Sequence, residues 1–239
     1  MTQKQVLIII HQKDSNLGAI GDILQTQGYY LDVRCPAHGD RLPSDLEQHD
    51  AVVVFGGPMS ANDDRTLPFI RQELDWLPIA LETEKPFLGV CLGAQLLARI
   101  LGGKVTPHPE EITEIGYFQI QPVEHSHSSR NSQSKYFDIP RHVYHWHEEG
   151  IELPATATKL ATGNTFSTQA FCYGHKAYGV QFHPEMTRKI MEKWLASGVK
   201  MLERSGAQGR EEQVKNHLLY GASCLSWLEE FIPFWLQDA

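Results

Sequence analysis

An apolar segment that runs directly into a cysteine between two glycines constrains the fold of this chain more than any other feature. Residues 86–90 (PFLGV) have the unbroken apolar character of a strand buried on both faces, and residues 92–101 have helical spacing. Cys91 lies between them, bracketed by Gly89 and Gly93. Because neither glycine carries a Cβ, the helix can fold back closely against the strand while the residue between them projects outward. This pattern predicts a sharp strand–turn–helix elbow.

The rest of the first half alternates in the same way between strand and helix patterns. Strands are predicted at residues 5–11, 29–35 and 50–55, and helices at residues 17–27 and 68–81. This order predicts an α/β fold with a mostly parallel central sheet that is flanked by helices and joined by right-handed crossovers.

The pattern changes after Gly103. Short β-like segments follow with few helical patterns between them, at residues 115–123, 142–147, 157–162, 168–173 and 177–182. We expect these segments to be added antiparallel strands, with the last one returning to the centre of the parallel sheet. The segment 124–135 (EHSHSSRNSQSK) is rich in serine, which predicts a solvated loop.

Residues 186–239 have a helical pattern with two apolar stripes. One stripe consists of Leu225, Leu228, Ile232 and Trp235, and the other of Trp227, Phe231 and Phe234. A helix that is apolar on two faces is usually buried on both, which favours packing on its own domain and leaves a homodimer contact as a further possibility. Pro233 is predicted to end or kink the helix near residues 231–232. We therefore expect an α/β domain at residues 1–185 and a helical extension at residues 186–239 on the same domain.

Charge and hydropathy argue against some classes of partner. The formal net charge of −8 disfavours a general nucleic-acid or anionic-membrane surface. The longest apolar run near the start is Val6–Ile10, and no stretch approaches the roughly 20 residues that span a bilayer. The cysteines are far apart and form no CxxC pair, which favours reduced thiols in a cytoplasmic protein. They are Cys35, Cys91, Cys172 and Cys224.

Two pairs of histidines are candidates for metal ligands. His125 and His127 lie in the serine-rich loop with no cysteine or carboxylate cluster nearby. His145 and His147 bracket Trp146, but this H-x-H pattern lacks further ligands, so we expect pocket wall or core packing. The sequence therefore predicts no metal and no other cofactor.

Cys91 is the candidate nucleophile. At the N-terminus of a helix, the macrodipole and free N–H groups stabilise a thiolate. The alternative is a buried apolar cysteine in a glycine-containing turn. The two flanking glycines at the end of a buried strand favour the nucleophile, whereas Cys35, Cys172 and Cys224 lack such a setting and are expected to be structural.

The candidate base follows the last predicted strand. In an extended backbone, residues i and i+2 point the same way, so His183 and Glu185 project from one side. Pro184 favours an extended conformation at His183 and stiffens this spacing. Glu185 can then accept from one imidazole nitrogen and orient the other toward sulfur. Taken alone, the same three residues are also a common way to end a strand in a turn.

The candidate oxyanion site is the segment 56–60 (GGPMS), which follows another buried strand. Loops at the carboxyl ends of neighbouring parallel strands share one crevice. We expect Gly57 to offer its backbone N–H there, with the N–H of Leu92 as the second donor.

Three motifs together give the chain a family resemblance. The segments GGPMS (56–60), GVCLGAQLLA (89–98) and GVQFHPE (179–185) have the order and roughly the spacing of a class I glutamine amidotransferase domain, the triad type found in GMP synthase. The resemblance extends over residues 5–185 and implies a flavodoxin-like fold.

The resemblance also implies roles for individual residues. Cys91 would attack the side-chain amide of glutamine and form a γ-glutamyl thioester, with His183 and Glu185 completing a catalytic triad. Gly57 and Leu92 match the oxyanion-hole positions. The positions expected to contact the substrate are Gly56 and Gln95, together with the backbone around His147 and Glu148, which falls where the family grips the amino-acid end of glutamine.

Two departures from the family pattern affect these expectations. GMP synthases continue into an ATP-using synthetase domain, and this chain shows neither such a domain nor its phosphate-binding loop. His147 is followed by Glu148-Glu149, where the GMP synthase branch typically shows Gly-Asp. This second departure changes the residues next to the position where the family contacts the amino group of the substrate.

Three functions fit the sequence. The chain is either the glutaminase partner of an ammonia-accepting synthetase subunit, or an independent hydrolase or transferase of γ-glutamyl amides and peptides, or a catalytically silent binding or regulatory module. The presence of all three triad positions favours the first two.

Overall fold

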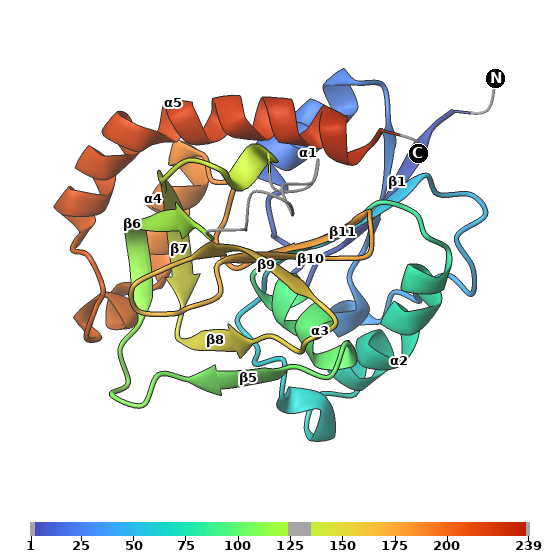
Figure 1. Cartoon of the computed structure of the whole chain (residues 1–239), viewed down its shortest axis with the longest axis horizontal. Coiled ribbons are helices and arrows are strands. Elements are labelled where there is room, and N and C mark those ends of the chain that lie inside the picture. Colours follow the sequence, from blue (N-terminus) through green and yellow to red (C-terminus); the bar gives the residue numbers. More distant parts are fainter. Residues whose placement is uncertain (1–2, 124–134, 238–239) are drawn as a thin grey trace.

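The computed structural model describes residues 3–123 and 135–237 and contains one large mixed sheet covered by helices on both faces (Figure 1). The serine-rich segment with His125 and His127 lies outside the described residues. The strands are β1 (Gln5–Ile9), β2 (Tyr30–Arg34), β3 (Ala51–Val54), β4 (Phe87–Val90), β5 (Lys104–Pro107), β6 (Glu114–Pro122), β7 (Arg141–His147), β8 (Glu149–Glu152), β9 (Thr158–Thr162), β10 (Ala170–Tyr173) and β11 (Ala177–Val180).

The topology of the sheet agrees with the sequence analysis. Its strand order is β2-β1-β3-β4-β11-β10-β9-β6-β7. Strands β2, β1, β3, β4 and β11 run parallel, and β10, β9, β6 and β7 continue the sheet with antiparallel pairs. The last strand, β11, returns to the centre and pairs with β4, as predicted.

The longer helices are α1 (Gly18–Thr26), α2 (Pro68–Glu82), α3 (Leu92–Ile100), α4 (Arg188–Ser197) and α5 (Arg210–Trp235). Successive side chains of a strand point to opposite faces of the sheet, so β1 contributes to two cores. Val6 and Ile8 lie in the core under α1 and α5, whereas Leu7 and Ile9 lie in the core under α2 and α3. Figure 1 shows these two helix layers above and below the sheet.

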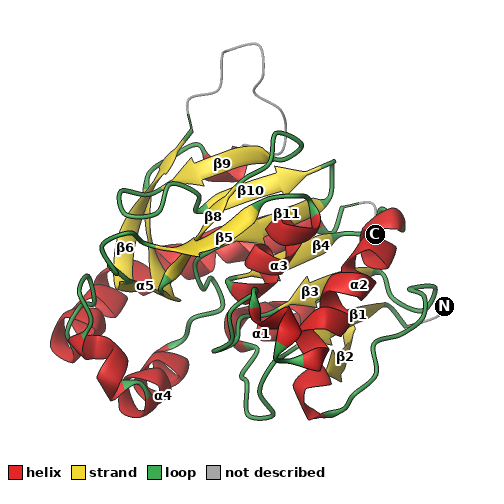
Figure 2. Cartoon of the chain, turned by 90° about the horizontal axis from the view of Figure 1, so that it is seen from below, coloured by secondary structure: helices red, strands yellow, loops and turns green. Residues whose placement is uncertain are grey.

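One small sheet was not predicted. β5 and β8 form an antiparallel pair that packs beside α3 (Figure 2). Their sequences, KVTP and EGIE, are short and polar and carry no clear alternation, so nothing local marks them as strands. β8 begins at Glu149, two residues after His147. Its pairing with β5 therefore helps to fix the backbone of the segment that follows His147.

The C-terminal helix packs on the sheet of its own chain. Trp227, Phe231 and Trp235 on α5 are buried in the same core as the strands, with Phe231 fully covered. Of the two predicted effects of Pro233, an end or a kink of the helix, the end is wrong, because α5 continues to Trp235. Pro233 lacks the N–H that would bond to the carbonyl of Glu229, but Glu229 lies on the exposed side, where water can bond to that carbonyl.

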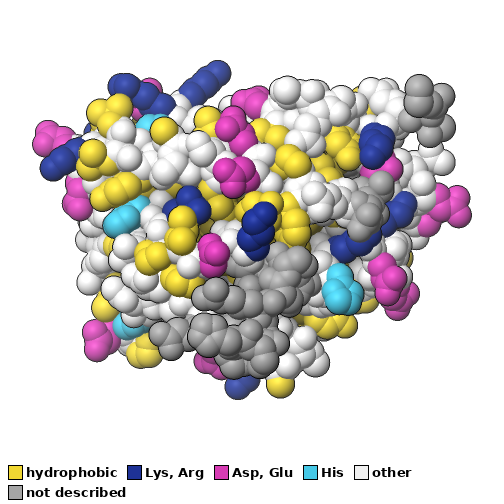
Figure 3. All heavy atoms as spheres, turned by 45° about the horizontal axis from the view of Figure 1, so that its top comes forward, with side chains coloured by type: hydrophobic (Ala, Val, Ile, Leu, Met, Phe, Trp, Pro, Cys, Tyr) yellow, Lys and Arg dark blue, Asp and Glu magenta, His cyan; other side chains and the backbone are white. Residues whose placement is uncertain are grey.

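The outer face of α5 is mixed in character. Leu218 and Leu219 are exposed there, and the space-filling view shows apolar side chains interspersed with acidic and basic ones on this side of the molecule (Figure 3). Within residues 3–123 and 135–237, none of the helices is both long enough and apolar enough to cross a membrane.

We expect Phe231→Ala to lower the free energy of unfolding by about 3–5 kcal/mol, because it removes a fully buried ring. That ring stacks on Trp227 with a centroid distance of 5.0 Å and packs edge-on to Tyr178. Leu218→Ala on the same helix is the matched control, since its side chain is 71% exposed and its loss should change stability by about 0.5 kcal/mol or less. Chemical denaturation measures both values, and equal values for the two variants would contradict the packing described here.

Candidate active site

The elbow at Cys91 has the geometry that the glycine pattern predicts. Cys91 has φ 50° and ψ −104°, a conformation that non-glycine residues rarely adopt. A Cβ on Gly93 would lie 2.1 Å from the carbonyl oxygen of Val54, and a Cβ on Gly89 would lie 2.6 Å from the backbone of Gly93. Helix α3 can therefore begin directly against β3 and β4 only because both positions are glycine.

Hydrogen bonds to the neighbouring strand fix the nucleophile candidate. The N–H of Cys91 donates to the carbonyl of Val180 at 2.8 Å, and the side-chain amide of Gln181 lies 3.6 Å from the Cys91 sulfur. Cys91 is 6% exposed, so the thiol is largely removed from water.

His183 and Glu185 lie together, as their spacing predicts. The ring Nδ1 of His183 is 2.8 Å from Oε1 of Glu185, and both side chains are 4% exposed. The N–H of His183 donates to the carbonyl of Tyr144, and the imidazole packs edge-on to Trp194 at 4.7 Å. Both the backbone and the imidazole ring of His183 are therefore held in place by neighbouring residues.

The backbone of Glu185 is held by the start of α1. Its carbonyl accepts from the N–H of Ala19 at 3.1 Å. Gly18 has φ +52°, and a Cβ there would lie 2.1 Å from the same carbonyl oxygen. This close approach requires glycine at position 18 and fixes the backbone of Glu185 relative to the start of α1.

The electrostatic surroundings favour a charged imidazole. Burial on its own favours the neutral ring, but the negative charges of Glu185 and Cys91 and hydrogen bonds to both outweigh it and raise the pKa of His183 to about 10. Because this pKa lies above the ordinary value of 6.5, the interaction stabilises the folded protein fully below pH 6.5. That contribution is lost as the pH rises through about 10.

The GGPMS loop lies against the side chains of Cys91 and His183. A Cβ on Gly56 would lie 2.9 Å from the ring carbon Cε1 of His183 and 3.4 Å from Cβ of Cys91. The next residue, Gly57, approaches the side chain of Leu92 at the start of α3. As the first residue of its helix, Leu92 has no carbonyl of that helix to receive its N–H. Three loops that are far apart in sequence thus meet around one thiol.

A chain of amides leads from the thiol to β8. Gln95 donates to the side-chain oxygen of Gln181 at 3.3 Å and to the carbonyl of Glu149 at 3.2 Å. Ring Nδ1 of His147 also lies 3.0 Å from that carbonyl. Gln181 was not among the predicted site residues, although it lies two positions before His183 and so projects from the same side of the chain.

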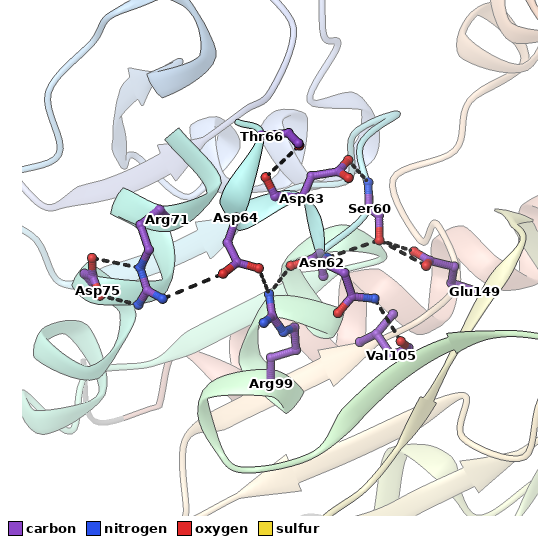
Figure 4. Close-up of polar contacts among 11 residues, drawn as sticks. Ser60, Asn62, Asp63, Asp64, Thr66, Arg71, Asp75, Arg99, Val105 and Glu149 are labelled. Carbon is purple, nitrogen blue, oxygen red and sulfur yellow. Dashed lines mark hydrogen bonds and ion pairs between the residues drawn. The ribbon is translucent and has the colours of Figure 1, made fainter. Parts of the chain in front are cut away.

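The two glutamates after His147 have different surroundings. Glu148 is exposed and forms an ion pair with Arg204. The hydroxyl of Ser60, which belongs to the GGPMS segment, donates its one hydrogen to the carboxylate of Glu149, with its oxygen 2.7 Å from Oε2 and 3.0 Å from Oε1 (Figure 4). The side chain of Glu149 is therefore tied to the GGPMS loop, whereas the side chain of Glu148 is tied to Arg204.

The loop that carries Ser60 is itself anchored by polar contacts. Asp63 accepts from the N–H of Ser60, and Asn62 donates to the carbonyl of Val105 on β5 (Figure 4). Asp64 pairs with Arg99 of α3 at 3.0 Å. The loop is thus tied both to α3 and to the small sheet.

The H-x-H pair has a partner that the sequence did not reveal. Glu114 on β6 places Oε2 3.2 Å from Nε2 of His147 and 3.5 Å from Nδ1 of His145, and these three donor atoms lie within 4.8 Å of one another. The expectation that this pair lacks further ligands is therefore wrong. β6 pairs with β7 in a register that sets Glu114 opposite His147, which no local pattern indicates.

This cluster is better explained by hydrogen bonding than by a metal. Burial alone raises the pKa of Glu114, but the imidazoles of His145 and His147 and the amide of Gln169 lower it to about 2. Burial lowers the pKa of His145 to about 3, so that ring is neutral. Nε2 of His145 is buried without a partner among the described atoms. Ligation of a metal through Nδ1 would leave an N–H at that position with no acceptor, contrary to usual metal sites.

These features define a class of protein, an α/β protein with a buried cysteine at a strand–helix elbow and a histidine–carboxylate pair beside it. The profile of the family "Glutamine amidotransferase class-I" matches residues 8–201. The chain belongs to this family. Membership supports hydrolysis of the glutamine amide by a cysteine mechanism.

Individual relatives agree with this assignment. The chain is 31% identical over 191 residues to the glutamine amidotransferase-like protein YfeJ of Salmonella typhimurium. This match covers 79% of this chain and 78% of YfeJ. It is 32% identical over 156 residues to GMP synthase of Vibrio campbellii, and the match covers 64% of this chain but only 26% of that enzyme. A crystal structure of a glutamine amidotransferase from Thermotoga maritima superposes with a TM-score of 0.87 at 29% identity, covering 99% of both chains.

We expect Glu185→Gln to lower the pKa of His183, because the substitution removes the largest of the influences that raise it. The midpoint of the His183 ring resonance in an NMR titration should fall by roughly 1–3 pH units. The shift should be confined to this ring, with His142 as an internal control, since only burial perturbs its pKa. An unchanged His183 midpoint would show that Glu185 does not hold the charge on the ring.

Proposed function

We propose that the chain hydrolyses the side-chain amide of glutamine through a γ-glutamyl thioester on Cys91, with His183 and Glu185 as the other members of a catalytic triad. The observation that carries this proposal is the convergence of the Cys91 elbow, the hydrogen-bonded His183–Glu185 pair and Gly56 within contact distance of one another. Family membership supports the substrate class and the use of a cysteine.

The proposed reaction has two halves. The sulfur of Cys91 attacks the side-chain carbonyl carbon of glutamine, and the N–H groups of Gly57 and Leu92 stabilise the oxyanion that forms. The carbon–nitrogen bond then breaks, and ammonia leaves with a proton from His183. In the second half, water gives a proton to His183 and attacks the thioester, which releases glutamate and restores the thiolate–imidazolium pair. Glu185 stabilises the charged ring throughout.

The substrate contacts follow from the surroundings of the thiol. Gly56, Gln95 and His147 line the polar route from Cys91 to β8 and are proposed to position the substrate. Of the two glutamates, Glu149 is the better candidate for the α-amino group of glutamine, because it is tied to the GGPMS loop while Glu148 is tied to Arg204.

The acceptor of the ammonia is proposed to be a synthetase partner. The GMP synthases that the chain resembles are described as glutamine-hydrolysing, and the chain matches only 26% of their length. We further propose a cytoplasmic location, because the four cysteines are far apart in the sequence and form no CxxC pair, which is typical of reduced thiols.

Cys91→Ser should abolish release of ammonia from glutamine and hydrolysis of a γ-glutamyl dipeptide, while leaving the fold intact. A loss of at least about 10⁴-fold in kcat is expected, because removing a nucleophile removes the covalent route. Cys224→Ser is the matched control, since that partly buried thiol lies on α5 and bonds to the carbonyl of His142.

The same assay separates the candidate functions. Glutamine turnover that rises when an ammonia-accepting enzyme is added supports the synthetase partner. Efficient turnover of the dipeptide alone identifies an independent γ-glutamyl hydrolase. Full activity of Cys91→Ser would refute the assignment of the nucleophile.

Glu149→Gln should raise KM for glutamine by about tenfold or more, because a charged contact to the substrate's amino group is worth about 1.5–3 kcal/mol. Glu148→Gln, one residue away, should leave KM within about twofold, since a solvent-exposed ion pair contributes little. Steady-state kinetics on the two purified variants measures both. A larger effect at Glu148 than at Glu149 would reverse the assignment.

A further inference from the structure

A second buried histidine–carboxylate pair lies beside the site and has no part in the proposed reaction. His11 follows β1 and is 1% exposed, and Glu73 on α2 is fully buried. Nε2 of His11 lies 3.1 Å from Oε2 of Glu73, and Nδ1 lies 3.1 Å from the carbonyl oxygen of Gly56. The imidazole thus links helix α2 to the GGPMS loop.

The direction of these hydrogen bonds follows from the chemistry of the partners. The Gly56 carbonyl can only accept, so Nδ1 of His11 must carry the hydrogen and donate it. When Nδ1–H donates to the Gly56 carbonyl, Nε2 of His11 and the carboxyl group of Glu73 share one proton. The pair is then either imidazolium and carboxylate or neutral imidazole and carboxylic acid. In both arrangements Glu73 fixes the plane of the ring, and the ring donates to Gly56.

The Gly56 carbonyl belongs to the peptide unit that also contains the N–H of Gly57. A trans peptide is planar, with its C=O and N–H pointing in opposite directions, so holding the oxygen toward His11 directs the Gly57 N–H away from it. Rotation of a peptide between two glycines meets little steric resistance. The local sequence therefore leaves the orientation of this unit open, and a contact from outside the loop has to set it.

We infer that His11, held by Glu73, is a positioning residue that locks the peptide between Gly56 and Gly57 with its N–H directed at the oxyanion. This inference rests on the proposed function, in which Gly57 supplies one of the two oxyanion donors. Packing supports it as well, since a Cβ on Gly57 would lie 2.7 Å from Cβ of His11. The hydrogen bond to the carbonyl also polarises the peptide and makes its N–H a stronger donor.

The test compares His11→Leu with His11→Asn. Leucine cannot donate to the Gly56 carbonyl, whereas the asparagine amide places a donor near the position of Nδ1. We expect His11→Leu to lower kcat for glutamine by about 10- to 100-fold, somewhat less than the loss of a whole oxyanion donor. KM should change little, and His11→Asn should recover most of the loss.

A second readout isolates the oxyanion hole from the nucleophile. Alkylation of Cys91 by iodoacetamide requires the thiolate but develops no oxyanion, so its rate should be the same in His11→Leu and in the unaltered protein. His49→Leu is the matched control, because His49 is also buried against a carboxylate, that of Asp32, beside Gln5 at the opposite end of β1. It should affect stability and leave kcat within about twofold, as a distant site does.

Each outcome bears on the inference. Unchanged kcat in His11→Leu, or equal losses of kcat and of alkylation, would overturn it. Should His11→Leu not fold, Glu73→Gln and Glu73→Met decide, because only glutamine can donate to Nε2 and keep Nδ1–H on Gly56. Equal kcat in these two variants would then overturn it. Failure of the proposed function gives a different result, since Cys91→Ser would remain active whatever happens at position 11.

Discussion

The contact between the start of α3 and the end of β3 is the constraint on which the rest of the site depends. Gly93 brings its backbone against the carbonyl of Val54, and this approach leaves no space for a Cβ. It forces Cys91 into a strained conformation and presents the residue at the carboxyl edge of the sheet. The pairing of β4 with both β3 and β11 then brings the loops that follow those strands to the same edge.

The buried charges of the site depend on one another as well. The site buries a thiol, an imidazole and a carboxylate, and burial of each charge alone is unfavourable. Together they compensate one another, and the raised pKa of His183 expresses that mutual stabilisation. The His11–Glu73 pair beneath the GGPMS loop and the Glu114–His145–His147 cluster beside β8 also place buried polar side chains against hydrogen-bonding partners. Buried polar groups around the thiol are thus held by partners on separate elements, which keeps the site rigid.

The sequence was most informative where the cause is local. The elbow depends on two glycines, the His183–Glu185 pair on a two-residue spacing, and the parallel strands on unbroken apolar runs, and each was predicted. What escaped prediction depends on contacts between distant segments. Glu114 joins the histidine pair only through the register of β6 on β7, and β5 and β8 are stabilised by each other and by α3. Pro233 lies inside a helix because buried neighbours hold its last turn.

The central claim is that Cys91 forms a covalent bond to the substrate, and mass spectrometry of enzyme quenched in acid during turnover of glutamine tests it most directly. The account predicts one γ-glutamyl group, on the peptide that contains Cys91, and none on the peptides that contain Cys35, Cys172 or Cys224. An adduct on one of those other cysteines would contradict it. So would glutamine turnover with no adduct on Cys91 even when hydrolysis of the thioester is slowed.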